Sequence, residues 1–260
     1  MEIGEGLLEI DCTGTNALKM FTPRASRYIS HEYLHQNPTW DFEDSPWKAR
    51  KVTETLTSAN FEPSSICEVG CGAGGVLAEL RQVFPDTELF GYDIAPDAAK
   101  FWSQHAWAKI SFKVGDFFAL NQRRFDVLLL LDVIEHLENP FDFLRRLRAY
   151  GHFFVFHIPL DLSATNILRK SPLLQARSRV GHLHYFTKDL ALSLLRECHY
   201  HVLDCRYTGA AFTSPKRNWM TRLAKLPRLL AYALSKDVGV RLLGGETLMI
   251  LAQARNESGY

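Results

Sequence analysis

Apolar runs alternate with amphipathic stretches along the chain from about residue 65 to residue 254. The apolar runs predict strands, and the stretches between them, which carry apolar residues at helical spacing, predict helices. Because strands that alternate with helices pair in parallel through right-handed crossovers, this order predicts a three-layer α/β sandwich. Strands are expected at 65–70, 87–93, 109–114, 125–131, 152–158, 200–207 and 246–254, and helices at about 73–84, 97–107, 139–149, 162–170 and 187–197.

The chain is less regular on either side of this alternating region. Residues 1–44 show little periodicity, and Ser45 and Pro46 then suit the N-cap and the first turn of a helix. We therefore predict an N-terminal cap over residues 1–60 and one domain over 61–260, with a helical insertion at about 210–245. This insertion is basic between 214 and 243, where Asp237 is the single acid. We interpret it as a lid on the edge of the sheet rather than a membrane-binding helix.

Composition supports a single globular domain, because 47% of the 260 residues are hydrophobic and 23% are charged. The net charge of +1 favours neither nucleic acid nor an anionic membrane as a partner. The acidic N-terminus is unlike a signal peptide and no apolar run is long enough to cross a bilayer, so the protein is expected in the cytoplasm. Five cysteines without a C-x-x-C pair predict reduced thiols, with neither disulfides nor a zinc site.

A cluster of glycines follows the first strand of the alternating region and precedes its first helix. In the stretch from Ile66 to Leu80, ICEVGCGAGGVLAEL, glycines stand at 70, 72, 74 and 75. Glycine accepts a positive φ and has no Cβ, so a ligand can lie against the backbone there, close to the N–H groups that begin the helix. The spacing also satisfies G-x-G-x-x-G, so it predicts a nucleotide-like ligand without excluding a dinucleotide.

Acidic residues beside the glycines and at the ends of the next two strands narrow the choice of ligand. Glu68 lies two residues before the first glycine, where a carboxylate suits an ammonium group better than a pyrophosphate. Asp93 ends the second strand and can accept hydrogen bonds from two ribose hydroxyls. After the third strand, Asp116 can accept from an exocyclic amine and Phe117 can flank a flat base. A nucleoside with an amino-acid tail fits these side chains.

The segments EVGCGAGG, GYD, GDF and DVIEHLENP, in this order and spacing, resemble the successive motifs of class I S-adenosylmethionine-dependent methyltransferases. The resemblance covers about 65–200, and the final ETLMILAQA is similar to the last, antiparallel strand of that family. It implies a Rossmann-like, mostly parallel sheet of seven strands with S-adenosylmethionine as cofactor. It also implies that Asp132 faces the sulfonium end. The expected cofactor-binding residues are Glu68, Gly70, Cys71, Gly72, Asp93, Ile94, Asp116, Phe117, Asp132 and Val133, with Trp47 covering the cofactor from the cap.

Histidines near the ends of later strands are the candidates for a general base. Methyl transfer is an in-line displacement on an activated sulfonium, so alignment does most of the catalysis, and a base is needed only for a protonated acceptor. His136 is the first choice, His184 is the second, and His157 can also reach the mouth of the pocket. The alternative for His136 is a loop histidine that shapes the pocket by hydrogen bonding.

A metal site made from Asp132, Glu135, His136 and His184 is a further alternative, because carboxylates and imidazoles bind divalent ions. Glu135 and His136 also fit the ordinary motif of metal-independent methyltransferases, however, so no metal is expected.

The sequence therefore favours a methyltransferase that acts on oxygen or nitrogen of a small-molecule metabolite. Two alternatives come from other classes: an NAD(P)-dependent oxidoreductase, which the glycine motif permits, and a cofactor-binding module without activity. Nucleic acid is not expected as the acceptor, because only residues 214–243 are basic and no separate binding module is evident.

Overall fold

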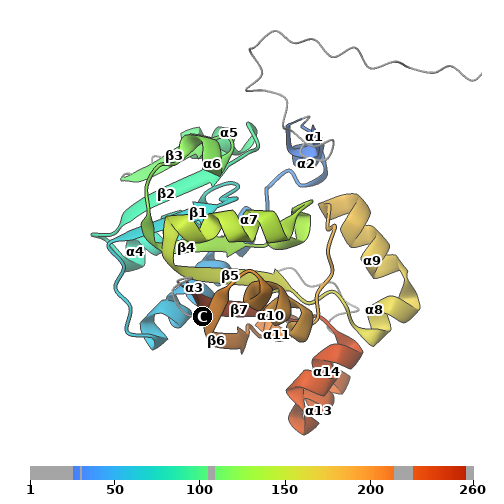
Figure 1. Cartoon of the computed structure of the whole chain (residues 1–260). Coiled ribbons are helices and arrows are strands. Elements are labelled where there is room, and N and C mark those ends of the chain that lie inside the picture. Colours follow the sequence, from blue (N-terminus) through green and yellow to red (C-terminus); the bar gives the residue numbers. More distant parts are fainter. Residues whose placement is uncertain (1–25, 30, 105–108, 214–224, 256–260) are drawn as a thin grey trace, which may run out of the picture.

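The computed structural model of the protein describes residues 26–29, 31–104, 109–213 and 225–255. At its centre is a seven-stranded sheet with the order β3-β2-β1-β4-β5-β7-β6 (Figure 1). The pairings from β3 to β5 are parallel, and β7 is antiparallel to both of its neighbours, so the predicted fold class is confirmed. The strands are β1 (Ser65–Val69), β2 (Glu88–Asp93), β3 (Ile110–Val114), β4 (Phe125–Leu131), β5 (Gly151–Pro159), β6 (Tyr200–Tyr207) and β7 (Thr247–Ala254).

Helices precede the sheet and connect its strands. All five helices predicted in the alternating region are present, and the end of the one predicted at 97–107 lies outside the described residues. The helices are α1 (Ser26–Ile29), α2 (Glu32–Gln36), α3 (Ser45–Ser58), α4 (Gly75–Val83), α5 (Ala98–Gln104), α6 (Phe117–Leu120), α7 (Pro140–Leu147), α8 (Ala164–Arg169), α9 (Ser171–Gln175), α10 (Lys188–Glu197), α11 (Ala210–Thr213), α13 (Lys225–Leu234) and α14 (Lys236–Leu243). Among the shorter turns, η1 (Phe42–Asp44) and η2 (Ile134–His136) are 3₁₀ helices.

Both faces of the sheet are buried, as its central strand requires. On β4, Leu128 and Leu130 belong to one apolar cluster, and Val127, Leu129 and Leu131 belong to the other. Side chains of α7 and α10 complete the first cluster, and side chains of α3 and α4 complete the second. Figure 1 shows α7 lying across one face of the sheet. A parallel strand covered on both faces has no polar side, which explains the unbroken apolar run in β4.

The start of α3 differs from the sequence prediction. Ser45 is predicted as the N-cap, whereas the structure has Asp44 at the N-cap and gives Ser45 helical angles, φ −57° and ψ −44°. The reason is that η1 runs directly into α3, so the backbone is already helical at this residue. The side chain of Ser45 is instead buried against Gly75 at the start of α4.

Helix α3 shares the core of the sheet although it lies within the predicted cap. Its residues Ala49, Val52 and Leu56 are buried in the same cluster as Leu77 and Leu80 of α4. The predicted boundary at residue 60 therefore falls after an integral helix of the sandwich. The first 25 residues of the predicted cap lie outside the described part of the chain.

The predicted insertion is mostly helical where the structure describes it, in α11, α13 and α14, and its residues 214–224 are outside the described ranges. Val240 of α14 is buried in the core, whereas Leu230 and Leu234 of α13 are 64% and 90% exposed. Figure 1 shows α13 and α14 projecting from the main body near α8. Within the described residues, no helix has both the length and the apolar character needed to cross a membrane.

Candidate active site

The turn between β1 and α4 brings bare backbone to the carboxyl end of the sheet. Gly70 and Gly72 have φ of +78° and +50°, conformations that residues with side chains rarely adopt. A Cβ at Gly72 would lie 2.7 Å from the indole of Trp40, and one at Gly70 would lie 2.7 Å from Cγ2 of Val133. Glycine is thus required at both positions, for backbone conformation and for close packing.

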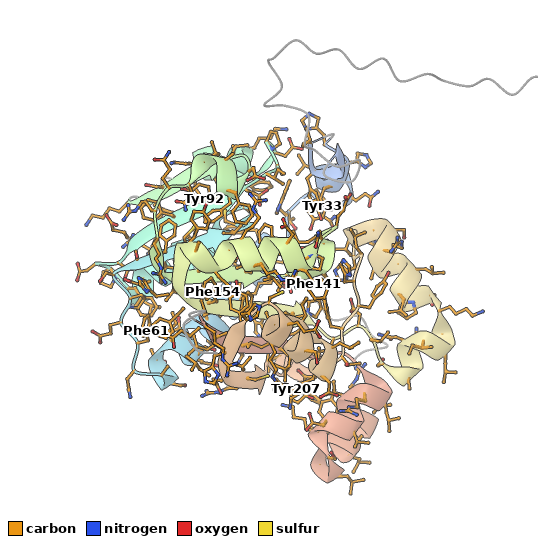
Figure 2. All side chains as sticks on the ribbon, viewed as in Figure 1. Tyr33, Phe61, Tyr92, Phe141, Phe154 and Tyr207 are labelled. Atoms are coloured by element: carbon orange, nitrogen blue, oxygen red, sulfur yellow. The ribbon has the colours of Figure 1, made fainter. Side chains whose placement is uncertain are left out.

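The N-terminal segment packs on this turn. Trp40 lies against Gly72, and Phe42 lies against Gly75. Trp40 has a φ of +50° and packs on the ring of Tyr33, with centroids 5.0 Å apart. Tyr33 is labelled in Figure 2, on the segment that carries α1 and α2. The cap is therefore in a position to enclose a ligand bound at the turn.

Glu68 is buried beside this turn without a complete set of partners. Its side chain is 3% exposed, and its Oε2 atom has no hydrogen-bond partner among the residues that the structure describes. Burial raises the pKa of this carboxyl to about 8, against the lowering effect of Lys48. A ligand ammonium group at Oε2 would supply the missing partner and would favour the ionised carboxylate.

Asp93 ends β2 and links it to the glycine turn. Its Oδ2 accepts from Gly72 N at 2.7 Å and its Oδ1 from Ala95 N at 2.8 Å, while burial raises its pKa to about 6. A carboxylate has about four acceptor positions, so ribose hydroxyls could still donate to it. Of the neighbours expected at the cofactor, Ile94 is half-buried, and Cys71 is a buried free thiol.

The two residues expected to bind adenine lie at the start of α6. Asp116 is the N-cap of this helix, and its Oδ1 accepts from Phe118 N at 2.7 Å and Ala119 N at 3.1 Å. Phe117 is 4% exposed, and its ring packs on Tyr92 with centroids 5.1 Å apart. Both side chains thus have structural roles, and their contacts with adenine stay predictions.

Asp132, directly after β4, joins three elements. Its φ of +56° is uncommon for a residue other than glycine. Its Oδ2 lies 2.7 Å from Nζ of Lys48 on α3, and its Oδ1 lies 2.7 Å from Nδ1 of His157 on β5. Burial opposes ionisation, but His157 and Lys48 hold the pKa of Asp132 well below its usual range. Burial also opposes the charge of Lys48, yet Asp132 raises the pKa of this ammonium, so both groups are charged.

His157, one of the predicted bases, has both ring nitrogens in contact with protein groups. Nδ1 meets Asp132, and Nε2 lies 2.7 Å from Oγ1 of Thr247 on β7. The side chain of His157 is 3% exposed. Its ring packs edge-on against the indole of Trp47, with ring centroids 5.8 Å apart. Trp47 donates from Nε1 to Thr213 Oγ1 at 3.0 Å, so it lies beside β5 and α11, and its contact with the cofactor stays a prediction.

A second cluster of titratable side chains is formed by residues of η2 and of the loop before α10. His136 Nε2 lies 3.9 Å from Oε1 of Glu135, and the rings of His136 and His182 are 4.9 Å apart. His136 Nδ1 is 3.1 Å from the hydroxyl of Tyr28, and His182 Nδ1 is 2.6 Å from Oδ2 of Asp161. Glu135, His136 and His182 each offer one ligand atom, and these three atoms lie within 4.8 Å of one another. These residues could therefore hold a metal ion.

His184, the second predicted base, does not join this group. Its Nε2 lies 2.9 Å from the carbonyl oxygen of Leu137, to which it donates. The structure therefore brings His136 together with His182, and it engages His184 with the backbone.

Sequence reasoning did not select Lys48, Asp161, His182 or Thr247 as site residues. Asp161 comes shortly after the end of β5, and Asp93 is the last residue of β2, so the rule that strand ends carry ligand groups could have found Asp161 as well. No local pattern marks Lys48, whose partner belongs to a distant segment of the chain.

A polar cavity of about 470 Å³ lies beyond the end of β5. Asp161 and Thr247, which contact two of the site histidines, form part of its wall. Arg228 of α13 also lines it, and the Nε and Nη1 atoms of this guanidinium are buried without a hydrogen-bond partner among the described residues. Glu246 is another wall residue, and its Oε1 atom is likewise buried without a hydrogen-bond partner among the described residues.

The chain is similar to a known protein family, to curated proteins and to solved structures. The family described as "Methyltransferase domain" matches residues 42–203. Ajmaline N-methyltransferase of Rauvolfia serpentina is 31% identical over 134 residues, which are 44% of this chain and 45% of that protein. The chain spans less than half the length of the curated relatives that it matches.

Among the solved structures that share the fold are two methyltransferases. The plantazolicin methyltransferase BpumL in complex with a monoazolic desmethylPZN analog and SAH has a TM-score of 0.58 and 16% identity, over 89% of this chain and 96% of that chain. Magnesium protoporphyrin IX methyltransferase (ChlM) from Synechocystis PCC 6803 with bound SAH has a TM-score of 0.54 and 14% identity, over 89% and 93% of the two chains.

The fold, the glycine turn and the family match define the class of protein. The chain belongs to the methyltransferase-domain family, among the class I S-adenosylmethionine-dependent methyltransferases. Its cofactor is S-adenosylmethionine, as the sequence predicts, and an NAD(P)-dependent oxidoreductase is not favoured.

Proposed function

We propose that this protein transfers the methyl group of S-adenosylmethionine to an oxygen or nitrogen atom of a small-molecule metabolite. The observation that carries the proposal is the buried, incompletely paired carboxyl of Glu68 beside the glycine turn. Methyl transfer is supported by the family match, and a small acceptor by the relative named ajmaline N-methyltransferase.

The donor pocket would use charges of both signs. Glu68 would accept from the ammonium of the methionine part, and Lys48, which is close enough to lower the pKa of Glu68, would attract its carboxylate. Asp93 would accept from the ribose hydroxyls, and Asp116 from the adenine amine. The backbone at Gly72 would lie against the ligand after Trp40 has moved from its contact with this residue.

The residues around Asp132 would align the donor. The cofactor supplies an activated methyl group on a sulfonium centre, and the ionised Asp132 carboxylate would face that positive charge. Lys48 and His157 fix both oxygens of this carboxylate, so we assign them positioning roles. Of the three predicted bases, His136 keeps the better geometry, because His157 is enclosed and His184 is bonded to the backbone.

We propose that the acceptor binds in the cavity beyond β5. The unpaired nitrogens of Arg228 favour an acceptor with a carboxylate or phosphate group, because a guanidinium binds such groups with paired hydrogen bonds. Arg169 lines the same cavity and would add positive charge. Two residues of the cavity wall, Asp161 and Thr247, contact His182 and His157, so an acceptor bound in the cavity would lie next to the site histidines.

Calorimetric titration tests the donor pocket, and a screen of metabolites with labelled methyl donor tests the reaction. S-Adenosylmethionine and its demethylated product should bind, NAD should not, and Glu68→Gln should weaken binding while Glu79→Gln, an exposed change on α4, should not. The absence of binding by both donor and product would refute the proposal. Binding without turnover of any acceptor would instead favour a module without activity.

A further inference from the structure

Glu135, His136 and His182 form a compact set of metal-binding side chains that the donor pocket does not use. Glu135 and His136 are neighbours in η2, and His182 comes from the loop before α10, far from them in the sequence. One ligand atom of each lies within 4.8 Å of the other two. A small inward movement of the side chains would bring these atoms to the spacing that a single coordinated ion requires.

Glu135 supplies an independent sign that a ligand belongs here. Its side chain is 0% exposed, and neither carboxylate oxygen has a hydrogen-bond partner among the described residues. The nearest imidazole nitrogen, Nε2 of His136, is 3.9 Å from Oε1, which is too far for a hydrogen bond. A buried carboxyl with two unpaired oxygens is costly, and a coordinated cation would supply the missing partner.

The two imidazoles are held as metal ligands usually are. His182 has Nδ1 on the Asp161 carboxylate at 2.6 Å, and His136 has Nδ1 on the Tyr28 hydroxyl at 3.1 Å. Metal-bound histidines commonly donate their second ring N–H to a carboxylate or another oxygen, which fixes the tautomer and the ring orientation. The Asp161 carboxylate can only accept, so Nδ1 of His182 carries the proton and Nε2 is its ligand atom. The Tyr28 hydroxyl can accept from Nδ1 of His136, and Nε2 of His136 would then be the ligand atom.

The ligand set differs from the one that the sequence suggests. Asp132 has one oxygen on Lys48 and the other on His157, and its carboxylate is therefore committed to the donor side. Nε2 of His184 is bonded to a backbone carbonyl. The fold thus removes two of the four residues in that set and adds His182.

We propose that Glu135, His136 and His182 bind one divalent ion of the zinc, cobalt or manganese class, with open coordination positions that face the acceptor. Two imidazoles and one carboxylate suit such ions better than Mg²⁺ or Ca²⁺, which prefer all-oxygen sites. A site with three protein ligands keeps a position for water or substrate, as catalytic sites do.

The role of this ion in catalysis rests on the proposed function. A His136 imidazole that coordinates the ion cannot also act as the general base, so the ion would take over this task. An acceptor hydroxyl bound to the cation would have a lowered pKa and would release its proton to solvent. The oxygen lone pair then forms the new O–CH₃ bond, and the S–CH₃ bond breaks with its electron pair remaining on sulfur. The products are the methyl ether, neutral S-adenosylhomocysteine and the proton released to solvent, so charge and atoms balance.

Cobalt titration of the metal-free protein tests the site without any acceptor. The full chain is stripped with a chelator and titrated with Co²⁺, whose visible absorption reports bound metal, and Zn²⁺ is then added as a competitor. One equivalent should bind. Glu135→Gln and His182→Gln should each weaken Co²⁺ binding by at least about 100-fold, and Asp161→Asn, which removes an outer partner, by about 10- to 100-fold. His184→Gln is the matched control and should change Co²⁺ affinity by less than about 3-fold.

The result that would overturn the site is a folded wild-type protein without saturable Co²⁺ or Zn²⁺ binding. Equal loss in His184→Gln and His182→Gln, or unchanged binding in both Glu135→Gln and His182→Gln, would also overturn it. Circular dichroism confirms that each variant is folded, and two ligand variants on different segments guard against a local folding defect. S-Adenosylhomocysteine binding is measured in parallel. Metal binding without cofactor binding would contradict the proposed function alone, and the reverse would contradict the metal site alone.

Discussion

Replacing Glu68 with glutamine should stabilise the cofactor-free protein while it weakens cofactor binding. Burial raises the pKa of Glu68 to about 8 from an ordinary value of 4.5. Between these pH values the folded state holds a proton that the unfolded state has released, so the free energy of unfolding falls as pH rises, by about 1.4 kcal/mol per unit. The stabilisation is complete below pH 4.5 and is lost through pH 8. Glutamine does not ionise, so Glu68→Gln avoids this loss.

Chemical denaturation of both proteins at pH 5.5, 6.5 and 7.5 measures the effect. Over these two pH units the wild type should lose about 3 kcal/mol relative to Glu68→Gln, which corresponds to roughly 6 to 12 °C in Tm. Glu79→Gln, at an exposed position on α4, controls for the change in net charge and should follow the wild type.

Cofactor binding should respond in the opposite direction. Losing a charged hydrogen-bond partner costs about 2 kcal/mol, so Glu68→Gln should lower S-adenosylmethionine affinity by about 30-fold or more. In the wild type, calorimetric affinity should rise from pH 6 to pH 8, because an ammonium ligand requires the ionised carboxylate and the free carboxyl has a pKa of about 8. A variant that is less stable than the wild type at pH 7.5, or that binds the cofactor equally well, would refute this reasoning.

Three further variants test other parts of the site. Lys48→Met should destabilise the protein by about 2 kcal/mol in denaturation, because it leaves the largely buried Asp132 carboxylate with one partner fewer; Lys51→Met, which breaks a more exposed pair, should cost less than about 1 kcal/mol. Gly72→Ala should lose at least about 1 kcal/mol of stability and bind the cofactor more weakly in calorimetry, since φ is +50° and the new Cβ meets an indole ring; unchanged binding would contradict the role of this turn. Arg228→Gln should raise KM for the acceptor about 10-fold or more without changing cofactor affinity, whereas equal loss of both would argue against a separate acceptor cavity.

Most of the fold follows from features within short stretches of sequence. The apolar run in β4 predicts a central strand, and the structure has β4 in the middle of the sheet. Gly70 and Gly72 have the positive φ values that the turn was expected to need. These predictions succeed because periodicity and backbone preference act over a few neighbouring residues. Ser45 fails as an N-cap because the preceding turn, rather than the residue type, decides where the helix begins.

The donor class could be read from the chain, and the arrangement around the acceptor could not. Glycines and acids at strand ends predict a nucleoside with an amino-acid tail, and the resemblance to class I methyltransferases implies which one. By contrast, His182 and His184 stand two residues apart in one loop, and no local signal tells which imidazole joins His136. Likewise, Lys48 meets Asp132 only because α3 packs on the sheet beside the end of β4. Backbone conformation is encoded locally, whereas contacts between side chains from distant segments depend on how the finished layers pack.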